Sequence, residues 1–100
     1  MGQRRSKPKR LAEKLLAIRQ KLGVSQSQLA NLLEFDKGAA RISEYEHGTR
    51  EPSLLILLRY SKLARVSINV LVDDDAEPKF PNNLKPPPRR ITQWQPRERN

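Results

Sequence analysis

Side chains that could carry out covalent chemistry are scarce in this chain. Its 100 residues include one histidine, His47, and no cysteine. A nucleophile, a general base and a group that orients the base cannot be assembled from such a set, so we expect neither an enzyme nor a cofactor. His47 falls near the expected end of a helix, where an imidazole interacts favourably with the helix dipole. The lack of thiols excludes disulfides and fits a reducing compartment.

A short acidic cluster, Asp73-Asp74-Asp75 followed by Glu77, offers the ligand type that hard metal ions prefer. Adjacent carboxylates at a helix end, with no partner motif elsewhere in the chain, more often form a solvated linker. We therefore expect no metal site at this cluster.

The charge of the chain is typical of a protein that binds a polyanion. Lysine and arginine number 20 against 11 aspartate and glutamate, which gives a formal net charge of +9. Residues 1–10 carry five positive charges, and residues 79–100 carry six against one negative charge. Residues 11–72 are closer to balance, with nine positive and six negative charges. An apolar run of about 18 residues and a signal peptide are both absent, so we expect a cytoplasmic protein and no membrane partner.

Apolar periodicity and capping residues predict five helices and no strand. Leu11, Leu15, Ile18 and Leu22 recur at helical spacing, and Gly23 follows where this first helix should end. The N-caps of the second, fourth and fifth helices are Ser25, Ser53 and Ser67. The expected helices cover residues 11–22, 26–33, 37–47, 54–64 and 68–72.

Two neighbouring segments together have the pattern of a helix-turn-helix. The first is Ser25-Gln26-Ser27-Gln28-Leu29-Ala30, which begins with a helix N-cap. The second runs from Ile42 to Pro52, with Gly48 at a helix C-terminus and the proline just beyond it. Two short helices joined tightly can present one of them to the major groove of DNA.

These segments resemble the Cro and phage-repressor type of helix-turn-helix protein, the XRE family, whose pattern runs roughly VSQ-x-x-LA…IS-x-x-E-x-G-x-x-x-P. The matching residues are Val24, Ser25, Gln26, Leu29, Ala30, Ile42, Ser43, Glu46, Gly48 and Pro52. The resemblance covers about residues 11–72 and implies an all-α, five-helix lambda-repressor-like DNA-binding domain. The turn Glu34-Phe35-Asp36-Lys37-Gly38 departs from the pattern, because it is longer than usual and does not begin with glycine.

In the resembled family, the exposed face at the start of the third helix reads base edges. By alignment those positions are Lys37, Ala39, Ala40, Arg41 and Glu44. Arg41 could bridge N7 and O6 of guanine, Glu44 could accept from N4 of cytosine, and an alanine can contact a thymine methyl. A phosphate contact or a solvated charge is the alternative for Arg41.

Other positions are implied to lie against the DNA backbone or inside the domain. Gln26 matches a family glutamine whose side chain and backbone N–H approach a phosphate at the start of the second helix. Further candidates at the ends of the motif, each of which could also be plain surface, are Gln28, Thr49 and Arg50. Glu46 matches a glutamate that pairs internally with an arginine of the first helix, here Arg19. An exposed glutamate is the alternative.

The segments that flank the domain differ from it in composition. We expect residues 1–10 to form a disordered basic arm that either follows the DNA or only speeds association. Residues 73–100 form an acidic linker and then a Pro-rich basic tail, with six of the eight prolines in residues 78–96. Too little apolar surface offsets the ordering entropy there. The folded domain is therefore expected to be residues 11–72.

The fourth expected helix is apolar on more than one side. The residues expected to face the core are Leu54, Leu57, Leu58 and Ser61. Three others, Leu55, Ile56 and Leu63, fall where the family is usually polar or small, and with Val70 they would form an exposed patch. We expect a homodimer through the fourth and fifth helices. In the alternative, the tail covers the patch with Ile91 and Trp94.

The sequence thus predicts a nucleoid-associated protein that binds a specific site on double-stranded DNA as a transcriptional repressor or regulator. The antitoxin half of a toxin–antitoxin pair uses the same fold and is one alternative. An adaptor that binds protein or RNA is the other.

Overall fold

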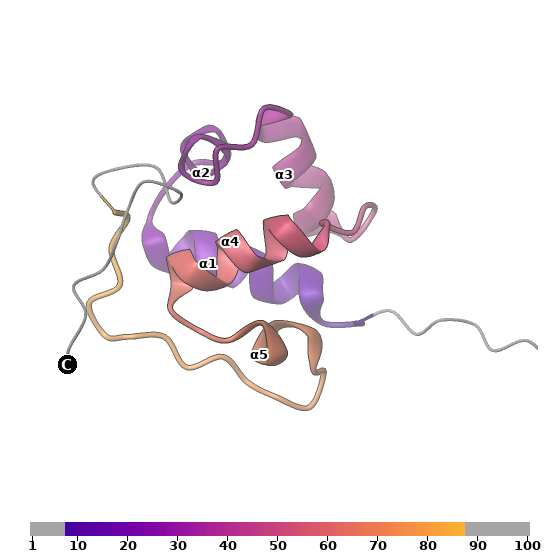
Figure 1. Cartoon of the computed structure of the whole chain (residues 1–100), viewed down its shortest axis with the longest axis vertical. Helices are drawn as coiled ribbons and strands as arrows, with labels where there is room; N and C mark the ends of the chain where they lie inside the picture. The colour runs from indigo at the N-terminus through magenta and orange to yellow at the C-terminus, as the bar shows by residue number, and fades with distance from the viewer. Residues whose placement is uncertain (1–7, 88–100) are drawn as a thin grey trace, which may run out of the picture.

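The computed structural model describes residues 8–87 and is helical, without strands, over that range. The arm at residues 1–7 and the tail residues Ile91 and Trp94, for which the sequence predicts contacts, lie outside it. The helices are α1 (Leu11–Leu22), α2 (Gln26–Leu32), α3 (Gly38–His47), α4 (Leu54–Ala64) and α5 (Ile68–Val72). α2 and α3 lie together on one side of α1 and α4, and α5 lies on the opposite side (Figure 1). The expected all-α, five-helix architecture is confirmed.

Serine side chains start three of these helices, as expected. Ser25, Ser53 and Ser67 each accept the backbone N–H of the residue three positions on, with Oγ···N distances of 3.0, 3.2 and 3.3 Å. At α2, the side-chain oxygen of Gln28 completes a capping box by accepting the backbone N–H of Ser25 at 2.8 Å. These bonds satisfy donors that a helix N-terminus otherwise leaves open.

The first four helices all end with a residue in the left-handed conformation. Gly23 and Gly48 hold this position after α1 and α3, with φ of 71° and 78°. Glu34 and Arg65 hold it after α2 and α4, with φ of 54° and 61°, where a side chain is strained. In each case the next backbone N–H bonds to the carbonyl five residues earlier, which closes a Schellman motif. Glycine therefore marks only two of the four helix ends.

The long turn between α2 and α3 is held by side chains. The N–H of Phe35 donates to the carbonyl of Ala30 at 2.9 Å, and the Phe35 ring centroid lies 5.8 Å from that of Tyr45 in α3. From α4, Arg59 donates to the carbonyl of Leu33, just past the end of α2, at 2.9 Å. Packing on α3 and a hydrogen bond from α4 thus fix a turn that lacks the usual glycine at its start.

α4 buries two of the four residues expected to face the core, Leu57 and Ser61, but not the other two. Its buried residues are Ile56, Leu57, Tyr60, Ser61, Leu63 and Ala64. Leu54 and Leu58, expected inside, are 72% and 38% exposed. The five consecutive apolar residues at 54–58 fit more than one helical stripe. The stripe that is buried is the one that stays apolar to the end of the helix, through Tyr60 and Leu63, whereas the other reaches Lys62.

The apolar patch expected on α4 is therefore wrong in two of its members. Ile56 and Leu63 belong to the core, at 6% and 1% exposure, while Leu55 is 54% exposed and Val70 is partly buried. The exposed apolar residues of α4, which we call the α4 apolar face, are Leu54, Leu55 and Leu58. Their spacing places them on one side of the first two turns of the helix.

Residues that follow α5 bond to the start of α1 instead of forming a solvated linker. The carboxylate of Asp74 accepts the backbone N–H groups of Lys9 at 2.9 Å and Arg10 at 3.0 Å, and these bonds lower the pKa of Asp74. Arg10 Nη1 lies 2.6 Å from Oε2 of Glu77 and lowers the pKa of that carboxyl group as well. We call these four residues the terminal clasp.

Two further contacts bring the segment after α5 into the folded unit. The buried Lys14 of α1 donates from Nζ to the carbonyls of Val70 at 2.8 Å and Asp73 at 2.7 Å, which lie at the C-terminal end of α5. Leu84 is buried in the core cluster, and Phe80 packs partly against it. The folded unit therefore continues past the boundary expected at residue 72.

Candidate nucleic-acid interface

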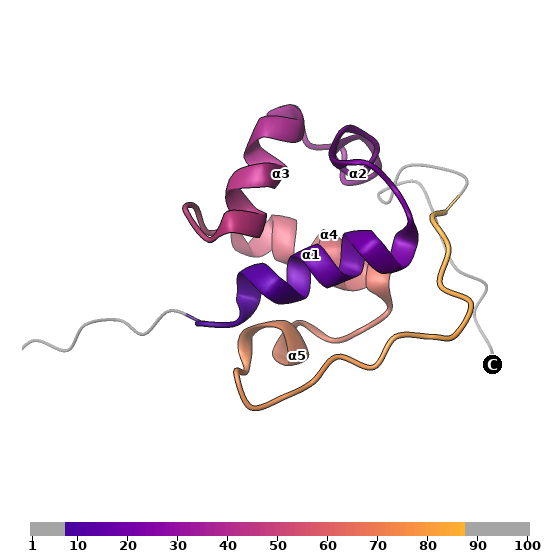
Figure 2. The same cartoon turned by 180° about the vertical axis from the view of Figure 1, so that it is seen from behind.

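The side of the molecule formed by α2 and α3 carries the residues expected at a nucleic-acid surface. This α2–α3 face includes the start of α2, the outer side of α3 and the loop at residues 48–52 that follows α3 (Figure 2). The expected contact residues that are exposed are Gln28, Lys37, Ala40, Thr49 and Arg50. Those that are partly buried are Gln26, Ala39, Arg41 and Glu44.

An ion pair joins α1 to α3 beneath this face. Nε of Arg19 lies 2.7 Å from Oε2 of Glu46, whose side chain is 4% exposed. Nη2 of Arg19 donates to the other carboxylate oxygen at 3.1 Å, so the pair is bidentate. The hydrogen bond with Glu46 raises the pKa of Arg19. The expected internal pair is confirmed, and the negative charge of Glu46 is withdrawn from the surface.

Gln26 joins the same carboxylate from α2. Its side-chain Nε2 donates to Oε1 of Glu46 at 3.0 Å, so one carboxylate connects three helices. The amide nitrogen expected at a phosphate is thus held inside the protein. The backbone N–H of Gln26 remains at the N-terminus of α2, where the helix dipole favours an anion. Gln28 is occupied by the capping box in the same turn.

The start of α3 presents small side chains. Lys37 is the N-cap residue and is exposed, without a capping hydrogen bond from its side chain. Ala40 is exposed and Ala39 is partly buried in the first turn of the helix. A helix start without bulky side chains can approach base pairs closely, and a methyl group can contact thymine.

Three charged residues gather on α3 and in the loop after it. Nε of Arg41 lies 3.0 Å and Nε of Arg50 lies 2.9 Å from the same oxygen, Oε1 of Glu44. Burial raises the pKa of Tyr45, and the nearby Arg41 opposes that increase. Thr49 Oγ1 donates to the backbone carbonyl of Glu44 at 3.3 Å. We call the three charged residues the Arg41–Glu44–Arg50 cluster.

Some contacts were not anticipated from the sequence. The burial of Lys14 could have been predicted, because it shares the apolar stripe of α1 with Leu11 and Ile18. The pairing of Arg50 with Glu44 spans the turn at the end of α3, and no sequence pattern signals it.

His47 makes a local contact within α3. Its Nδ1 lies 2.8 Å from the carbonyl oxygen of Ser43 one turn earlier, and the side chain is exposed. This placement at the helix C-terminus agrees with a favourable interaction with the helix dipole.

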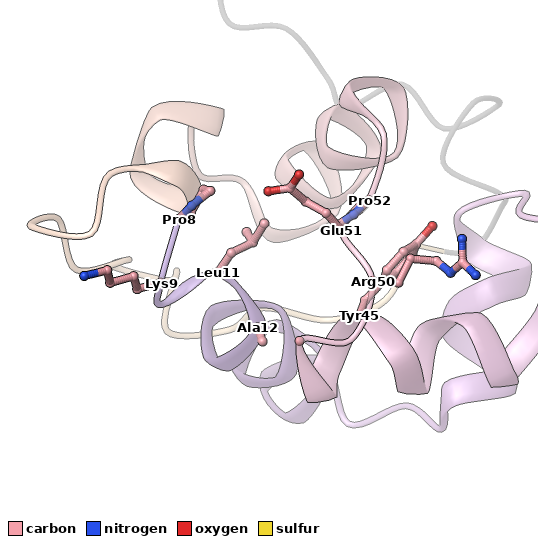
Figure 3. A pocket seen from close by; sticks show the side chains of 9 residues that line it. Pro8, Lys9, Leu11, Ala12, Tyr45, Arg50, Glu51 and Pro52 are labelled. Atoms are coloured by element: carbon pink, nitrogen blue, oxygen red, sulfur yellow. The ribbon is translucent and has the colours of Figure 1, made fainter. Parts of the chain in front are cut away.

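A small pocket of about 120 Å³ lies between the start of α1 and the loop after α3. Leu11 and Ala12 are among its lining residues, and the charged ends of Lys9, Arg50 and Glu51 point in different directions (Figure 3). The volume is below the roughly 300 Å³ at which small-molecule sites begin. The pocket therefore offers no convergent set of polar groups for a ligand.

The helix-turn-helix family model matches residues 15–71, which is more than half of the chain. The chain belongs to the XRE family of helix-turn-helix proteins. The match runs from α1 to α5, so it includes the α2–α3 face and the Arg19–Glu46 pair of this XRE protein. The family assignment makes the domain a DNA-binding regulator of the XRE type. Comparisons with curated proteins and with solved structures find no match. Among residues 8–87, the helices are too short or too polar to cross a membrane.

Proposed function

We propose that this XRE protein is a sequence-specific transcriptional repressor that reads the major groove of double-stranded DNA with α3. The observation that best supports this proposal is the inward position of Glu46, which Arg19 and Gln26 hold by three hydrogen bonds. The outer side of α3 and its flanks is left with small side chains and the cations Lys37, Arg41 and Arg50, against the one carboxylate of Glu44 that pairs with the two arginines. Such a surface favours approach to phosphate-lined grooves.

The first two turns of α3 supply the proposed base contacts. Arg41 bridges N7 and O6 of a guanine, a contact that discriminates among bases by about 1–3 kcal/mol. Ala39 and Ala40 admit thymine methyl groups beside it. The sequence at the bound site is then set by one strong polar contact and neighbouring apolar ones.

The proposed backbone contacts surround these positions. They comprise the N-terminus of α2 at Gln26, with Gln28, Lys37, Thr49 and Arg50. The exposed members donate hydrogen bonds or carry positive charge, and phosphate contacts of this kind fix the register of α3 without carrying sequence information.

A two-fold homodimer is proposed through the α4 apolar face. Leu54, Leu55 and Leu58 are exposed together, and a symmetric contact between two copies would bury them. Such a dimer places two recognition helices about 34 Å apart on one side of DNA. In sedimentation, Leu55→Glu should shift a wild-type dimer to monomer, whereas the control Lys21→Glu, at an exposed position of α1, should not. A wild-type protein that stays monomeric at high concentration contradicts the dimer.

Selection from random DNA duplexes tests the proposed function. We expect one enriched sequence with two-fold symmetry, and Arg41→Ala should relax the preference at a single base pair of each half-site. Lys79→Ala, at an exposed position after α5, serves as the matched loss of one cation and should leave the selected sequence unchanged. If the wild-type protein enriches no sequence, the repressor proposal is wrong and an adaptor function is favoured.

A further inference from the structure

We infer that Glu44 is a positioning residue that orients Arg41 and Arg50 toward DNA, and that it does not read a cytosine itself. The inference rests on the proposed function, because it concerns how α3 presents its hydrogen-bond donors. In this inference, the carboxylate of Glu44 sets the direction of the arginine that reads guanine. It thereby contributes to sequence discrimination.

The geometry of the cluster carries this inference. Nε of Arg41 and Nε of Arg50 lie 3.0 and 2.9 Å from one oxygen, Oε1 of Glu44, and Arg50 donates its Nε–H to that oxygen. A guanidinium group has five N–H donors in a rigid plane. With Nε beside Glu44, each guanidinium group still has its Nη1 and Nη2 end from which to donate. That end can make the paired hydrogen bonds by which arginine recognises guanine or phosphate.

Arg41 is held more firmly than an ordinary surface arginine. Its side chain is 27% exposed and lies beside Glu44, and the neighbouring Tyr45 is buried in the core. A flexible side chain loses rotamer freedom when it is ordered on binding, which weakens affinity. Because Glu44 restricts Arg41 before DNA arrives, less of this loss accompanies recognition.

The negative charge of Glu44 also favours discrimination between DNA sequences over general attraction to DNA. Arg41 and Arg50 bring two positive charges, and the carboxylate between them cancels one. A negative charge near the phosphates weakens binding to every DNA sequence. The directed hydrogen bonds from Arg41 are retained at the correct base pair, so the ratio of specific to non-specific affinity rises.

The cluster contributes little to holding the fold together. The side chains of Glu44 and Arg50 are 43% and 51% exposed, and ion pairs at such exposure add little to stability. A change at Glu44 should therefore affect DNA selection while leaving the melting temperature close to that of the wild type. This separates positioning from a purely structural role.

Selection from random duplexes with Glu44→Ala, Glu44→Gln and Arg41→Ala tests the inference. We expect Glu44→Ala to weaken preference at the same base pair as Arg41→Ala, within the roughly 5- to 150-fold range of one bidentate contact. Glu44→Gln keeps an acceptor oxygen and should lose less. Both Glu44 variants should bind non-specific DNA more tightly. Glu13→Ala removes an equal charge from an exposed site on α1 and should leave the preference unchanged.

Other outcomes would contradict either the positioning role of Glu44 or the proposed function. If Glu44→Ala loses preference at a different base pair while the guanine is retained, or leaves the selected sequence unaltered, the positioning role is wrong. If the wild-type protein selects no sequence, the proposed function is wrong. A DNA-free measurement still tests the cluster in that case, because Glu44→Ala should shift the NMR signals of both Nε–H groups, of Arg41 and Arg50. Unshifted signals overturn the inference.

Discussion

Glu44 and Glu46 are two residues apart on α3 and experience different surroundings. The side chain of Glu46 is 4% exposed and bonds to Arg19 and Gln26, whereas that of Glu44 is 43% exposed and meets two arginines of the surface. A buried charge that loses its partner is left uncompensated, while an exposed pair adds little to stability. The same substitution at the two positions should therefore have different effects.

Glu46→Gln should lower the free energy of unfolding by about 3 kcal/mol. The expected value is at the low end for a broken buried pair, because Arg19 retains 21% exposure and can be partly solvated. Glu44→Gln is the control and should change the same quantity by less than about 1 kcal/mol. Urea unfolding followed by circular dichroism measures both. Equal stabilities of the two variants would place Glu46 in a solvated setting and contradict the pair.

Tyr60 shows the opposite situation, a buried polar group without compensation. Its hydroxyl has no hydrogen-bond partner among residues 8–87, and burial raises the pKa of the side chain. Tyr60→Phe should therefore raise the free energy of unfolding by about 1 kcal/mol, since it removes the polar group and keeps the ring. Tyr45→Phe is the control and should give no such increase, because among residues 8–87 the buried side-chain oxygen without a hydrogen-bond partner is that of Tyr60. A destabilised Tyr60→Phe would reveal a partner for the Tyr60 oxygen.

At the scale of elements, local signals in the sequence located the helices. Each serine cap satisfies donors of its own helix, so Ser25, Ser53 and Ser67 could be recognised without knowledge of the fold. Gly23 and Gly48 could likewise be recognised from the local sequence as the ends of α1 and α3. The face of α4 could not be read in this way, because its apolar run is long enough to fit two stripes and the choice depends on the packing of the whole helix.

The contacts of the candidate site likewise differ in whether the sequence could predict them. The Arg19–Glu46 pair followed from resemblance to a family, since its members are far apart in the chain. The Arg41–Glu44 spacing of three residues is visible in any helix, but Arg50 reaches Glu44 only because the chain turns back after α3. The bond from Gln26 to Glu46 likewise depends on how α2 and α3 pack, so the sequence did not reveal it.

Strain at the end of α4 leads to a prediction for this helix. Arg65 has φ of 61° in a position that α1 and α3 give to glycine. Arg65→Gly relieves the side-chain strain, and part of the gain is offset by the greater freedom of glycine in the unfolded chain. We expect an increase of about 0.5–1 kcal/mol in the free energy of unfolding.

Arg65→Ala is the matched control, because it removes the charge and keeps the Cβ atom. It should give no increase in stability, whether measured by heat or by urea. If both variants are stabilised alike, the gain comes from the lost charge and the account based on backbone strain is wrong.

At the scale of the whole molecule, charge is distributed between two sides. The acidic residues of the terminal clasp follow α5, on the side of α1 and α4 opposite α2 and α3 (Figure 1). Negative charge is thereby placed away from the proposed DNA surface, which favours association in the correct orientation. The clasp also fixes the point, at Lys9 and Arg10, where the chain enters α1.

The terminal clasp should make the stability of the protein depend on pH. The pKa values of Asp74 and Glu77 are lowered in the folded state by their bonds to Lys9 and Arg10. For a carboxyl group with a lowered folded-state pKa, the stabilisation is complete above the unfolded value of about 4 and is lost as pH falls through the folded value. Asp74→Ala should therefore melt at a lower temperature than the wild type at pH 7, and the difference should shrink as the solution is acidified. Asp75→Ala removes the neighbouring exposed carboxylate and should melt close to the wild type at both pH values. Melting curves that show the same difference between Asp74→Ala and wild type at every pH would mean that the charge of Asp74 does not hold the two ends of the domain together.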